Sequence, residues 1–213
     1  MSATEITIVD YGLGNLMSVS QAVTHVGGNP ILTSDPEVVA TAERIILPGV
    51  GAFAVAMGFL EDLGLDRALK DANYRGAALL GICLGMQLLF SESLEFGSTS
   101  GLGFVEGTVR PLVAEGTADS GVRSTHIGWR SLDVANARVN HPLLARTETG
   151  DSVYFVHSYS GHTINASQTL ATVDYAGSAI AAVVGAGNVL GVQFHPEKSG
   201  PAGLRILENF CGI

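Results

Sequence analysis

The chain has 213 residues, of which 46% are hydrophobic and 15% charged, and its formal net charge is −9. This size suits one sizeable α/β domain and excludes a second catalytic domain, while the acidic balance argues against a nucleic-acid partner. Without a secretory signal or an apolar stretch of roughly 18 residues, we expect a cytoplasmic protein. The two cysteines, Cys83 and Cys211, are expected to be free thiols, with Cys211 serving as inert packing.

Short apolar strands alternate with helices in the first half of the chain. Strands are predicted over residues 6–10, 30–33, 44–47 and 77–80. Helices are predicted over residues 15–25, 54–63 and 66–74, and a further short helix follows the cap that Asp35 and Pro36 form. This alternation favours right-handed βαβ crossovers and a parallel sheet.

Shorter segments rich in Val and Gly follow residue 101. Strands are predicted over residues 108–112, 153–159, 168–174, 179–184 and 189–194. We expect these to be antiparallel strands added to the central sheet, and a helix over residues 202–210 to close the fold. No repeat or linker divides the sequence, so a single α/β domain over residues 1–213 is predicted.

One cysteine lies where a strand meets a helix. Cys83 follows the apolar run 77–80 within the glycine-flanked turn 81–85, and a helical pattern is predicted from Met86 to Phe90. Glycines allow a tight turn of the nucleophile-elbow kind, and unpaired amides at a helix N-terminus favour a thiolate. The alternative is a small buried hydrophobic residue, which is the usual role of an intracellular cysteine.

A second segment supplies the partners that a reactive thiol needs. The apolar strand 189–194 is followed by His195, Pro196 and Glu197. A thiol nucleophile needs a base, and the base needs an anion that fixes its tautomer. Three motifs, at residues 10–12, at residues 48–51 and at Cys83, also follow predicted strands. Because ligands bind at the carboxyl ends of parallel strands, we expect a single site at that edge of the sheet.

The pattern Cys-x-Gly-x-Gln over residues 83–87, with His-Pro-Glu over residues 195–197, resembles the class I (triad) glutamine amidotransferases. Further matches over residues 10–15, 48–51 and 154–159 resemble the glutaminase subunits of imidazole glycerol phosphate synthases, and the similarity runs from Ile6 to the C-terminus. The resemblance implies a flavodoxin-like fold, with a central mostly parallel sheet, flanking helices and added antiparallel strands.

The resemblance also implies hydrolysis of glutamine through a cysteine thioester. Cys83 would be the nucleophile, His195 the general base and acid, and Glu197 the group that orients His195. The oxyanion hole implied by the resemblance comprises Gly49, Val50, Gly51 and Leu84. We further hypothesise that the peptide beside Val50 flips between donating and non-donating states.

Glutamine itself would contact Gly51, Gln87 and the segment His157, Ser158 and Tyr159. No cofactor and no metal are expected. A metal pair of His157 and His162 is less favoured than a hydrogen-bonded loop histidine, because no third ligand is near in sequence. The dinucleotide fingerprint around residues 12–14 lacks its third glycine.

Three acidic residues are read as solvated charges on helices. These are Asp71, Glu92 and Glu95.

A chain too short to hold a synthase must pass its ammonia to another polypeptide. The resemblance names a (β/α)8-barrel cyclase subunit, as heterodimer partner, which makes imidazole glycerol phosphate and an aminoimidazole carboxamide ribotide in histidine biosynthesis. Interface residues implied by the motifs are Asn15, Trp129, Tyr154 and Lys198. For Trp129, a place in the core is an equal alternative.

The sequence departs from the family pattern at Thr125, which replaces a proline, and at Arg130, which replaces an asparagine. These departures leave open a paralogous glutaminase subunit that feeds ammonia to a sugar-amidating synthase. From other classes, a flavodoxin-like cysteine hydrolase or deglycase and a non-enzymatic binding module also remain. The deglycase pattern lacks the His-Pro-Glu strand end and a glutamine at the position of Gln87.

Overall fold

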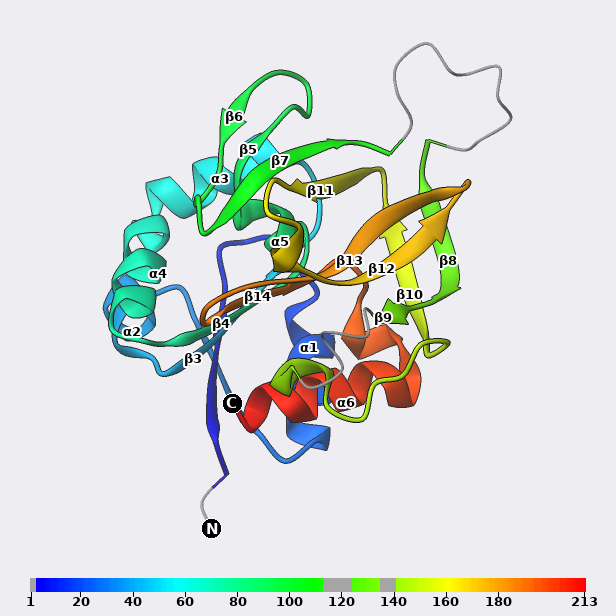
Figure 1. The fold of residues 1–213 in the computed structure, drawn as a ribbon. Helices are drawn as coiled ribbons and strands as arrows, with labels where there is room; N and C mark the ends of the chain where they lie inside the picture. The colour runs from blue at the N-terminus through cyan, green and yellow to red at the C-terminus, as the bar shows by residue number, and fades with distance from the viewer. Residues whose placement is uncertain (1–2, 113–123, 135–140) are drawn as a thin grey trace.

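The computed structural model describes residues 3–112, 124–134 and 141–213 (Figure 1). An eight-stranded sheet runs through the molecule in the order β2-β1-β3-β4-β14-β13-β12-β9. Five neighbouring strands are parallel: β2 (Asn29–Thr33), β1 (Glu5–Val9), β3 (Arg44–Gly49), β4 (Ala78–Cys83) and β14 (Val189–Val192). Three antiparallel strands extend the sheet beyond β14: β13 (Ser178–Ala186), β12 (Thr169–Tyr175) and β9 (Asp133–Val134).

Helices cover both faces of this sheet. The α-helices are α1 (Leu16–His25), α2 (Pro36–Thr41), α3 (Phe53–Asp62), α4 (Leu65–Tyr74), α5 (Leu84–Leu88) and α6 (Gly200–Cys211). Short 3₁₀ helices are η3 (Pro142–Leu144), η4 (Ala166–Gln168) and η5 (Pro196–Lys198). Figure 1 shows α1 and α6 together on one side of the sheet and α2, α3 and α4 on the other. None of the helices in the described ranges is long and apolar enough to cross a membrane.

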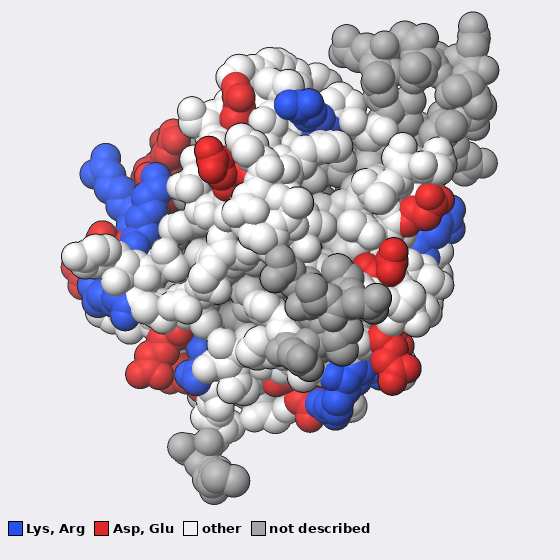
Figure 2. All heavy atoms as spheres, in the orientation of Figure 1, with Lys and Arg blue, Asp and Glu red and all other residues white. Residues whose placement is uncertain are grey.

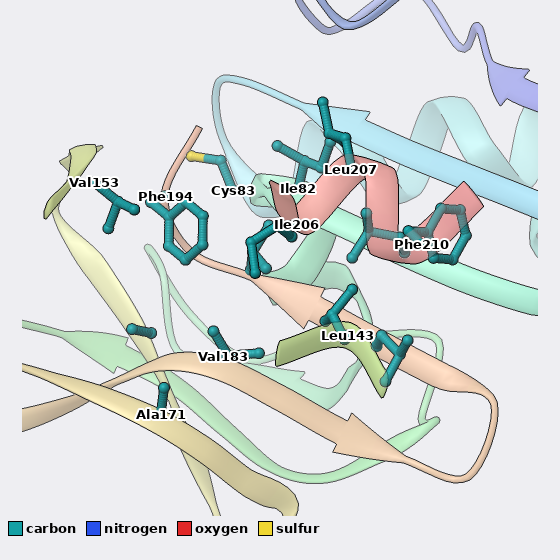
Figure 3. Close-up of a cluster of buried hydrophobic side chains, with 14 of the residues drawn as sticks. Ile82, Cys83, Leu143, Val153, Ala171, Val183, Phe194, Ile206, Leu207 and Phe210 are labelled. Carbon is teal, nitrogen blue, oxygen red and sulfur yellow. The ribbon is translucent and has the colours of Figure 1, made fainter. Parts of the chain in front are cut away.

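Two hydrophobic cores result, one on each face, because successive strand residues point to opposite faces. In β3, Ile46 belongs to the core beneath α1 and α6, whereas Ile45 and Leu47 belong to the core beneath α3 and α4. Strands buried on both faces read as continuous apolar runs, which is why they stand out in the sequence. Figure 3 shows the first core, in which Phe194 and Phe210 pack with neighbouring aliphatic side chains.

Two smaller sheets lie outside the central one. The four-stranded sheet has the order β11 (Tyr159–Thr163), β7 (Val105–Pro111), β5 (Phe90–Ser93) and β6 (Thr99–Ser100). The two-stranded sheet pairs β10 (Ser152–His157) with β8 (His126–Ser131). The sequence prediction that all late strands join the central sheet is therefore wrong in detail: β7, β10 and β11 do not, and β14 joins as a parallel strand.

Two predicted elements also have different bounds in the structure. The strand expected over residues 153–159 breaks at Ser158 into β10 and β11, which belong to different sheets. The helix expected to reach Phe90 ends at Leu88, and Phe90 begins β5. The reason is long-range pairing, since the carbonyls of Leu88 and Phe90 accept backbone N–H groups from Leu102 and Gly103.

Charged side chains of both signs are interspersed around the margin of the face shown in Figure 2. Asp71 lies on α4, as predicted. Glu92 lies on β5 and Glu95 in the loop after it, so the prediction that both are helical is wrong. That prediction failed because the helix after Cys83 is only one turn long.

Candidate active site

Cys83 occupies the sharp turn between β4 and α5. Its backbone has φ 55° and ψ −111°, a conformation that non-glycine residues rarely adopt. The glycines around it are required by close packing: a Cβ on Gly81 would lie 2.6 Å from the Gly85 carbonyl oxygen. A Cβ on Gly85 would lie 1.8 Å from the carbonyl oxygen of Leu47 in β3. The turn therefore resembles the predicted nucleophile elbow, with Cys83 6% exposed at the end of the strand.

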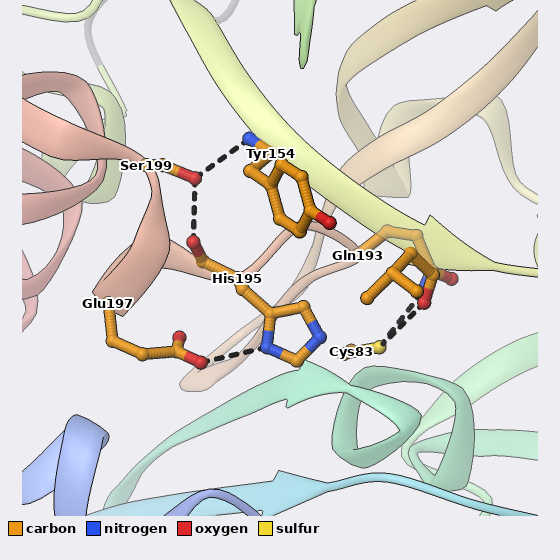
Figure 4. A network of polar contacts seen from close by, with 7 residues as sticks. Cys83, Tyr154, Gln193, His195, Glu197 and Ser199 are labelled. Carbon is orange, nitrogen blue, oxygen red and sulfur yellow. Dashed lines mark hydrogen bonds and ion pairs between the residues drawn. The ribbon is translucent and has the colours of Figure 1, made fainter. Parts of the chain in front are cut away.

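His195 and Glu197 lie at the end of the neighbouring parallel strand, β14. His195 Nδ1 and Glu197 Oε1 are 2.8 Å apart, and both side chains are buried. Because a carboxylate accepts only, this contact assigns the proton to Nδ1 and turns Nε2 toward Cys83 (Figure 4). Nε2 forms no hydrogen bond with the described residues. The three predicted catalytic side chains thus meet at one edge of the sheet.

The charge on His195 depends on these neighbours. Burial by itself lowers the pKa of the imidazole, but contact with Cys83 and Glu197 outweighs burial and raises it to about 9. The imidazolium form is therefore favoured at neutral pH. The ring stands beside the sulfur, so the arrangement brings a nucleophile and a proton donor together.

A cavity of about 410 Å³ opens beside this group. Its lining comprises Val50, Gly51, Cys83, Leu84, Gln87, Glu95, Phe96, Val156, His157, Ser158, Tyr159 and His195. All the predicted glutamine-contacting residues belong to this lining, as do three of the four predicted oxyanion residues. The cavity is large enough for a small-molecule substrate.

Gly49 is the predicted oxyanion residue that does not line the cavity. It ends β3, pairs with Cys83 in the sheet and lies behind the lining. A Cβ there would lie 2.5 Å from the Tyr11 hydroxyl, so only glycine fits. Gly51, by contrast, has φ 105° and open space around its Cα. The loop after β3 is therefore closely packed at Gly49, whereas Gly51 has free space where a Cβ would lie.

Gln87 lines the cavity, and its side-chain amide nitrogen is fixed by two hydrogen bonds. The Nε2 group donates to the Tyr159 carbonyl at 2.9 Å and to Gln193 Oε1 at 3.1 Å. Gln193 in turn donates to the Cys83 sulfur at 3.8 Å and is fully buried. Sequence reasoning missed Gln193, although a polar residue directly after an apolar buried strand was an available signal.

Glu95 is a second missed residue. The residue lines the cavity, and its carboxylate accepts the backbone N–H of Phe53 at 2.6 Å, at the start of α3. Phe96 and Val156 also line the cavity without having been predicted. No local pattern marks Glu95 or Phe96, because only the packing of their loop on α3 brings them here.

His157 belongs to a chain of buried histidines in the cavity wall. Its Nδ1 lies 2.8 Å from the Tyr159 carbonyl, which only accepts, so Nε2 receives the proton of His126 Nδ1 at 3.0 Å. Burial is the main cause that lowers the pKa of both rings to about 4. His162 instead contacts Ser160 at 3.2 Å. In the described ranges, no group of three His, Cys, Asp or Glu residues could hold a metal ion.

The predicted interface residues lie at or near the surface around this edge. Trp129 on β8 is 50% exposed, so the alternative of a core position is wrong. It packs edge-on against Tyr154 on β10, with ring centroids 5.9 Å apart. Lys198 is exposed on η5, directly after Glu197, and Asn15 is partly exposed at the start of α1.

The two departures from the family pattern have identifiable surroundings. Thr125 Oγ1 contacts Ser158 Oγ at 2.8 Å, at the cavity wall. Arg130 is next to Trp129 and donates to its carbonyl at 2.9 Å. Cys211 is partly buried against the core beneath α1 and α6, where burial raises the pKa of its thiol.

Comparison with known proteins agrees with this geometry. The family model described as Glutamine amidotransferase class-I matches residues 7–212. The chain is 46% identical over 205 residues to the imidazole glycerol phosphate synthase subunit HisH of Bacillus subtilis, covering 96% of this chain and 94% of the relative. It is 45% identical over 206 residues to the HisH subunit of Methanosarcina acetivorans, covering 96% of each chain.

Among solved structures, a chain from the structure of PurLQS from Thermotoga maritima aligns with a TM-score of 0.72 and 22% identity. The alignment covers 100% of this chain and 99% of the other, and it supports the fold alone. The fold class expected from the sequence is confirmed. The family match and the close relatives together show that the chain belongs to the class I glutamine amidotransferases and, within them, to the imidazole glycerol phosphate synthase subunits HisH.

Proposed function

We propose that the chain, as a single glutamine amidotransferase domain over residues 1–213, is the glutaminase subunit of an imidazole glycerol phosphate synthase. It hydrolyses glutamine to glutamate and ammonia. The observation that carries this proposal is the position of His195, which binds Glu197 through Nδ1 and faces Cys83 through Nε2 at the edge of the cavity. Membership in the HisH family supports the same assignment.

The reaction follows from these three side chains. His195 takes the proton of the Cys83 thiol through Nε2 and becomes an imidazolium, and the thiolate attacks the carboxamide carbon of glutamine and forms a tetrahedral oxyanion. The His195 imidazolium donates its proton to the nitrogen, the C–N bond breaks, and ammonia leaves a glutamyl thioester. Neutral His195 then accepts a proton from water, which attacks the thioester and releases glutamate and the thiolate. Glu197 holds the ring and offsets its positive charge.

The oxyanion needs backbone donors close to Cys83. Leu84 lines the cavity and begins α5, so its N–H has no partner within the helix and is a candidate donor to the oxyanion. The peptides between Gly49 and Gly51 are the second source. Loss of one such donor typically lowers turnover about 10²–10³-fold. The open backbone at Gly51 supports a flip of the peptide beside Val50 between a donating and a non-donating state.

The remaining lining provides polar groups for the two ends of the amino acid. The Gln87 amide nitrogen is already bonded, so its oxygen is the atom left to accept a substrate N–H. Glu95 adds an anion that suits the substrate α-ammonium. Backbone groups of the segment His157, Ser158 and Tyr159 complete the wall.

Ammonia released here would be protonated and lost in open water, so a partner must receive it. We infer that the partner is the (β/α)8-barrel cyclase subunit, docked over the surface that holds Asn15, Trp129, Tyr154 and Lys198. The cyclase makes imidazole glycerol phosphate and aminoimidazole carboxamide ribotide in histidine biosynthesis. We place both subunits in the cytoplasm.

The test measures glutamate release from glutamine by the chain alone and with the cyclase bound to its nucleotide substrate. We expect feeble activity alone and strong activation in the complex. Cys83→Ala should abolish release under both conditions. Hydroxylamine should trap the acyl group of the wild type as γ-glutamyl hydroxamate. Full activity of the isolated chain would contradict the coupling, and activity in Cys83→Ala would contradict the mechanism.

Thr125 and Arg130 are the specific observation behind a second candidate partner. Because Thr125 contacts the wall residue Ser158 and Arg130 contacts Trp129, both departures lie where a partner would be recognised. A sugar-amidating synthase is the alternative recipient of ammonia. Activation by that synthase, and not by the cyclase, would favour it.

A further inference from the structure

Strand β10 contacts the backbone of the base and the sulfur of the nucleophile from one edge. The Tyr154 carbonyl accepts the His195 N–H at 3.0 Å, and the Val156 carbonyl accepts the Cys83 thiol at 3.8 Å. Backbone groups of residues i and i+2 point to the same edge of a strand, and they repeat roughly every 7 Å. Strand β10 therefore ties His195 to Cys83 a second time, in addition to the direct pairing of β14 with β4.

Ser199 completes the attachment of His195 to this strand. Its hydroxyl oxygen accepts the Tyr154 N–H at 2.9 Å and donates to the His195 carbonyl at 2.6 Å (Figure 4). The side chain is 1% exposed and lies outside the cavity lining. Tyr154 thus uses both of its backbone polar groups to hold the segment that carries His195.

The hydroxyl of Ser199 does not cap the helix that it precedes. Ser199 stands at the N-cap of α6, where a serine hydroxyl usually accepts a backbone N–H of the first helical turn. Here the side chain forms no such bond, although the helix begins directly after it. The hydroxyl is instead committed to β10 and to His195.

We propose that Ser199 is a positioning residue for the glutaminase reaction, which holds His195 against β10 at the distance from Cys83 that proton transfer requires. The His195 carbonyl also accepts the Lys198 N–H at 3.0 Å. Removal of the hydroxyl therefore leaves the Tyr154 N–H as the group that loses its partner. The expected consequence is a wider separation between His195 and β10, which moves the imidazole away from Cys83 and leaves the predicted glutamine-contacting residues in place.

The role rests on the proposed function, and its test has two readouts. The first is kcat and KM for glutamine, measured with the cyclase bound. In Ser199→Ala we expect kcat to fall about 10- to 100-fold, because misplacement of a reacting group by about 1 Å costs that much. KM should stay within about twofold, since Ser199 does not line the cavity.

The second readout is titration of the His195 ring by NMR in the isolated chain. Contact with Cys83 and Glu197 raises the pKa of His195 to about 9. If Ser199→Ala moves the ring away from the sulfur, this pKa should fall. The titration needs neither glutamine nor a partner. A wild type that releases no ammonia would therefore contradict the proposed function while the titration still decides the role of Ser199.

Ser160→Ala is the matched control, because Ser160 is equally buried and contacts a different histidine, His162. We expect it to keep the wild-type kcat and the wild-type titration of His195. Ser199→Cys keeps the shape of the side chain with a slightly larger atom but forms only weak hydrogen bonds, and it serves if Ser199→Ala does not fold. Folded Ser199 variants with wild-type kcat and titration would overturn the proposal, as would an equal loss in Ser160→Ala.

Discussion

At the scale of single residues, the backbone of Cys83 concentrates the strain of the site. A non-glycine residue with φ 55° and ψ −111° costs of order 1–3 kcal/mol and persists only where the surroundings hold it. Here β4 holds one side and α5 the other, with Gly81 and Gly85 packed between them. The strained turn presents the sulfur to His195 and to the cavity, which a regular helix or strand would not do.

The buried pair His126 and His157 shows the opposite arrangement, in which histidines are kept neutral. Both rings lie in the interior, and the ring of His126 stacks 4.7 Å from Phe155. Because the pair is neutral, it adds no positive charge beside His195. His157 still donates from Nδ1 to the Tyr159 carbonyl. Protonation of His157 would remove the acceptor for His126 Nδ1, whereas the bond to the Tyr159 carbonyl would remain.

This pair predicts a loss of stability in acid. The pKa of each ring is about 4 in the folded protein and about 6.5 when unfolded, so the unfolded chain binds more protons between these values. The free energy of unfolding should fall as pH drops from about 6.5 to about 4. In His126→Gln, the slope of the free energy of unfolding against pH should decrease by an amount that corresponds to at most one bound proton. Urea unfolding at several pH values measures this slope.

The exposed residue His25 at the end of α1 supplies the control. His25→Gln should not reproduce the change in slope. An equal change in both variants, or none in His126→Gln, would contradict the assignment of a neutral buried pair.

At the scale of elements, the contact between β3 and the turn after β4 decides how closely the loop after Gly49 can approach the turn at Cys83. Leu47 and Gly85 touch through their backbones alone. This contact places the segment after Gly49 beside Leu84 at the cavity. A side chain at Gly85 would push the two candidate oxyanion segments apart.

We therefore expect Gly85→Ala to lower the free energy of unfolding by at least about 3 kcal/mol, because rigid backbone atoms would have to move. Gly58→Ala is the matched control, since Gly58 lies within α3 and a Cβ there meets nothing within 4 Å. It should stabilise the protein by about 0.5–1 kcal/mol. Chemical denaturation measures both. Wild-type stability of Gly85→Ala would show that this contact is not close.

At the scale of the whole molecule, the edge that holds the cavity also exposes large apolar side chains. Val50 and Phe96 are 41% and 90% exposed at the cavity, and Ile127 and Trp129 are 62% and 50% exposed on β8. These exposed side chains agree with the proposed partner, which would cover the cavity and receive the ammonia released there.

Trp129→Ala should weaken binding of the cyclase at least about tenfold, because buried aromatic residues carry much of the energy of an interface. Tyr74→Ala is the control, since Tyr74 is 93% exposed at the end of α4, away from β8 (Figure 1). Calorimetric titration of each variant with the cyclase measures the dissociation constants. An unchanged constant for Trp129→Ala, or an equal loss for Tyr74→Ala, would contradict the proposed docking surface.

The sequence by itself determined the features that depend on local patterns. The alternation of strands and helices, the glycine turn at Cys83 and the pair His195 and Glu197 were all visible, because apolar periodicity, turn glycines and short-range polar pairs are encoded within a few residues. These features sufficed for the alternating α/β character of the fold and for placing Cys83, His195 and Glu197 in one site, but not for Gln193 or Glu95.

Only the tertiary structure decided the features that depend on long-range pairing. The helix after Cys83 stops at Leu88 because residues 99–105 pair with the segment that follows. The break at Ser158, the place of Glu95 in the cavity and the link through Ser199 have the same origin. Each depends on hydrogen bonds of backbone or side chains between segments far apart in the chain, and a local pattern contains no information about which distant segment will be the partner.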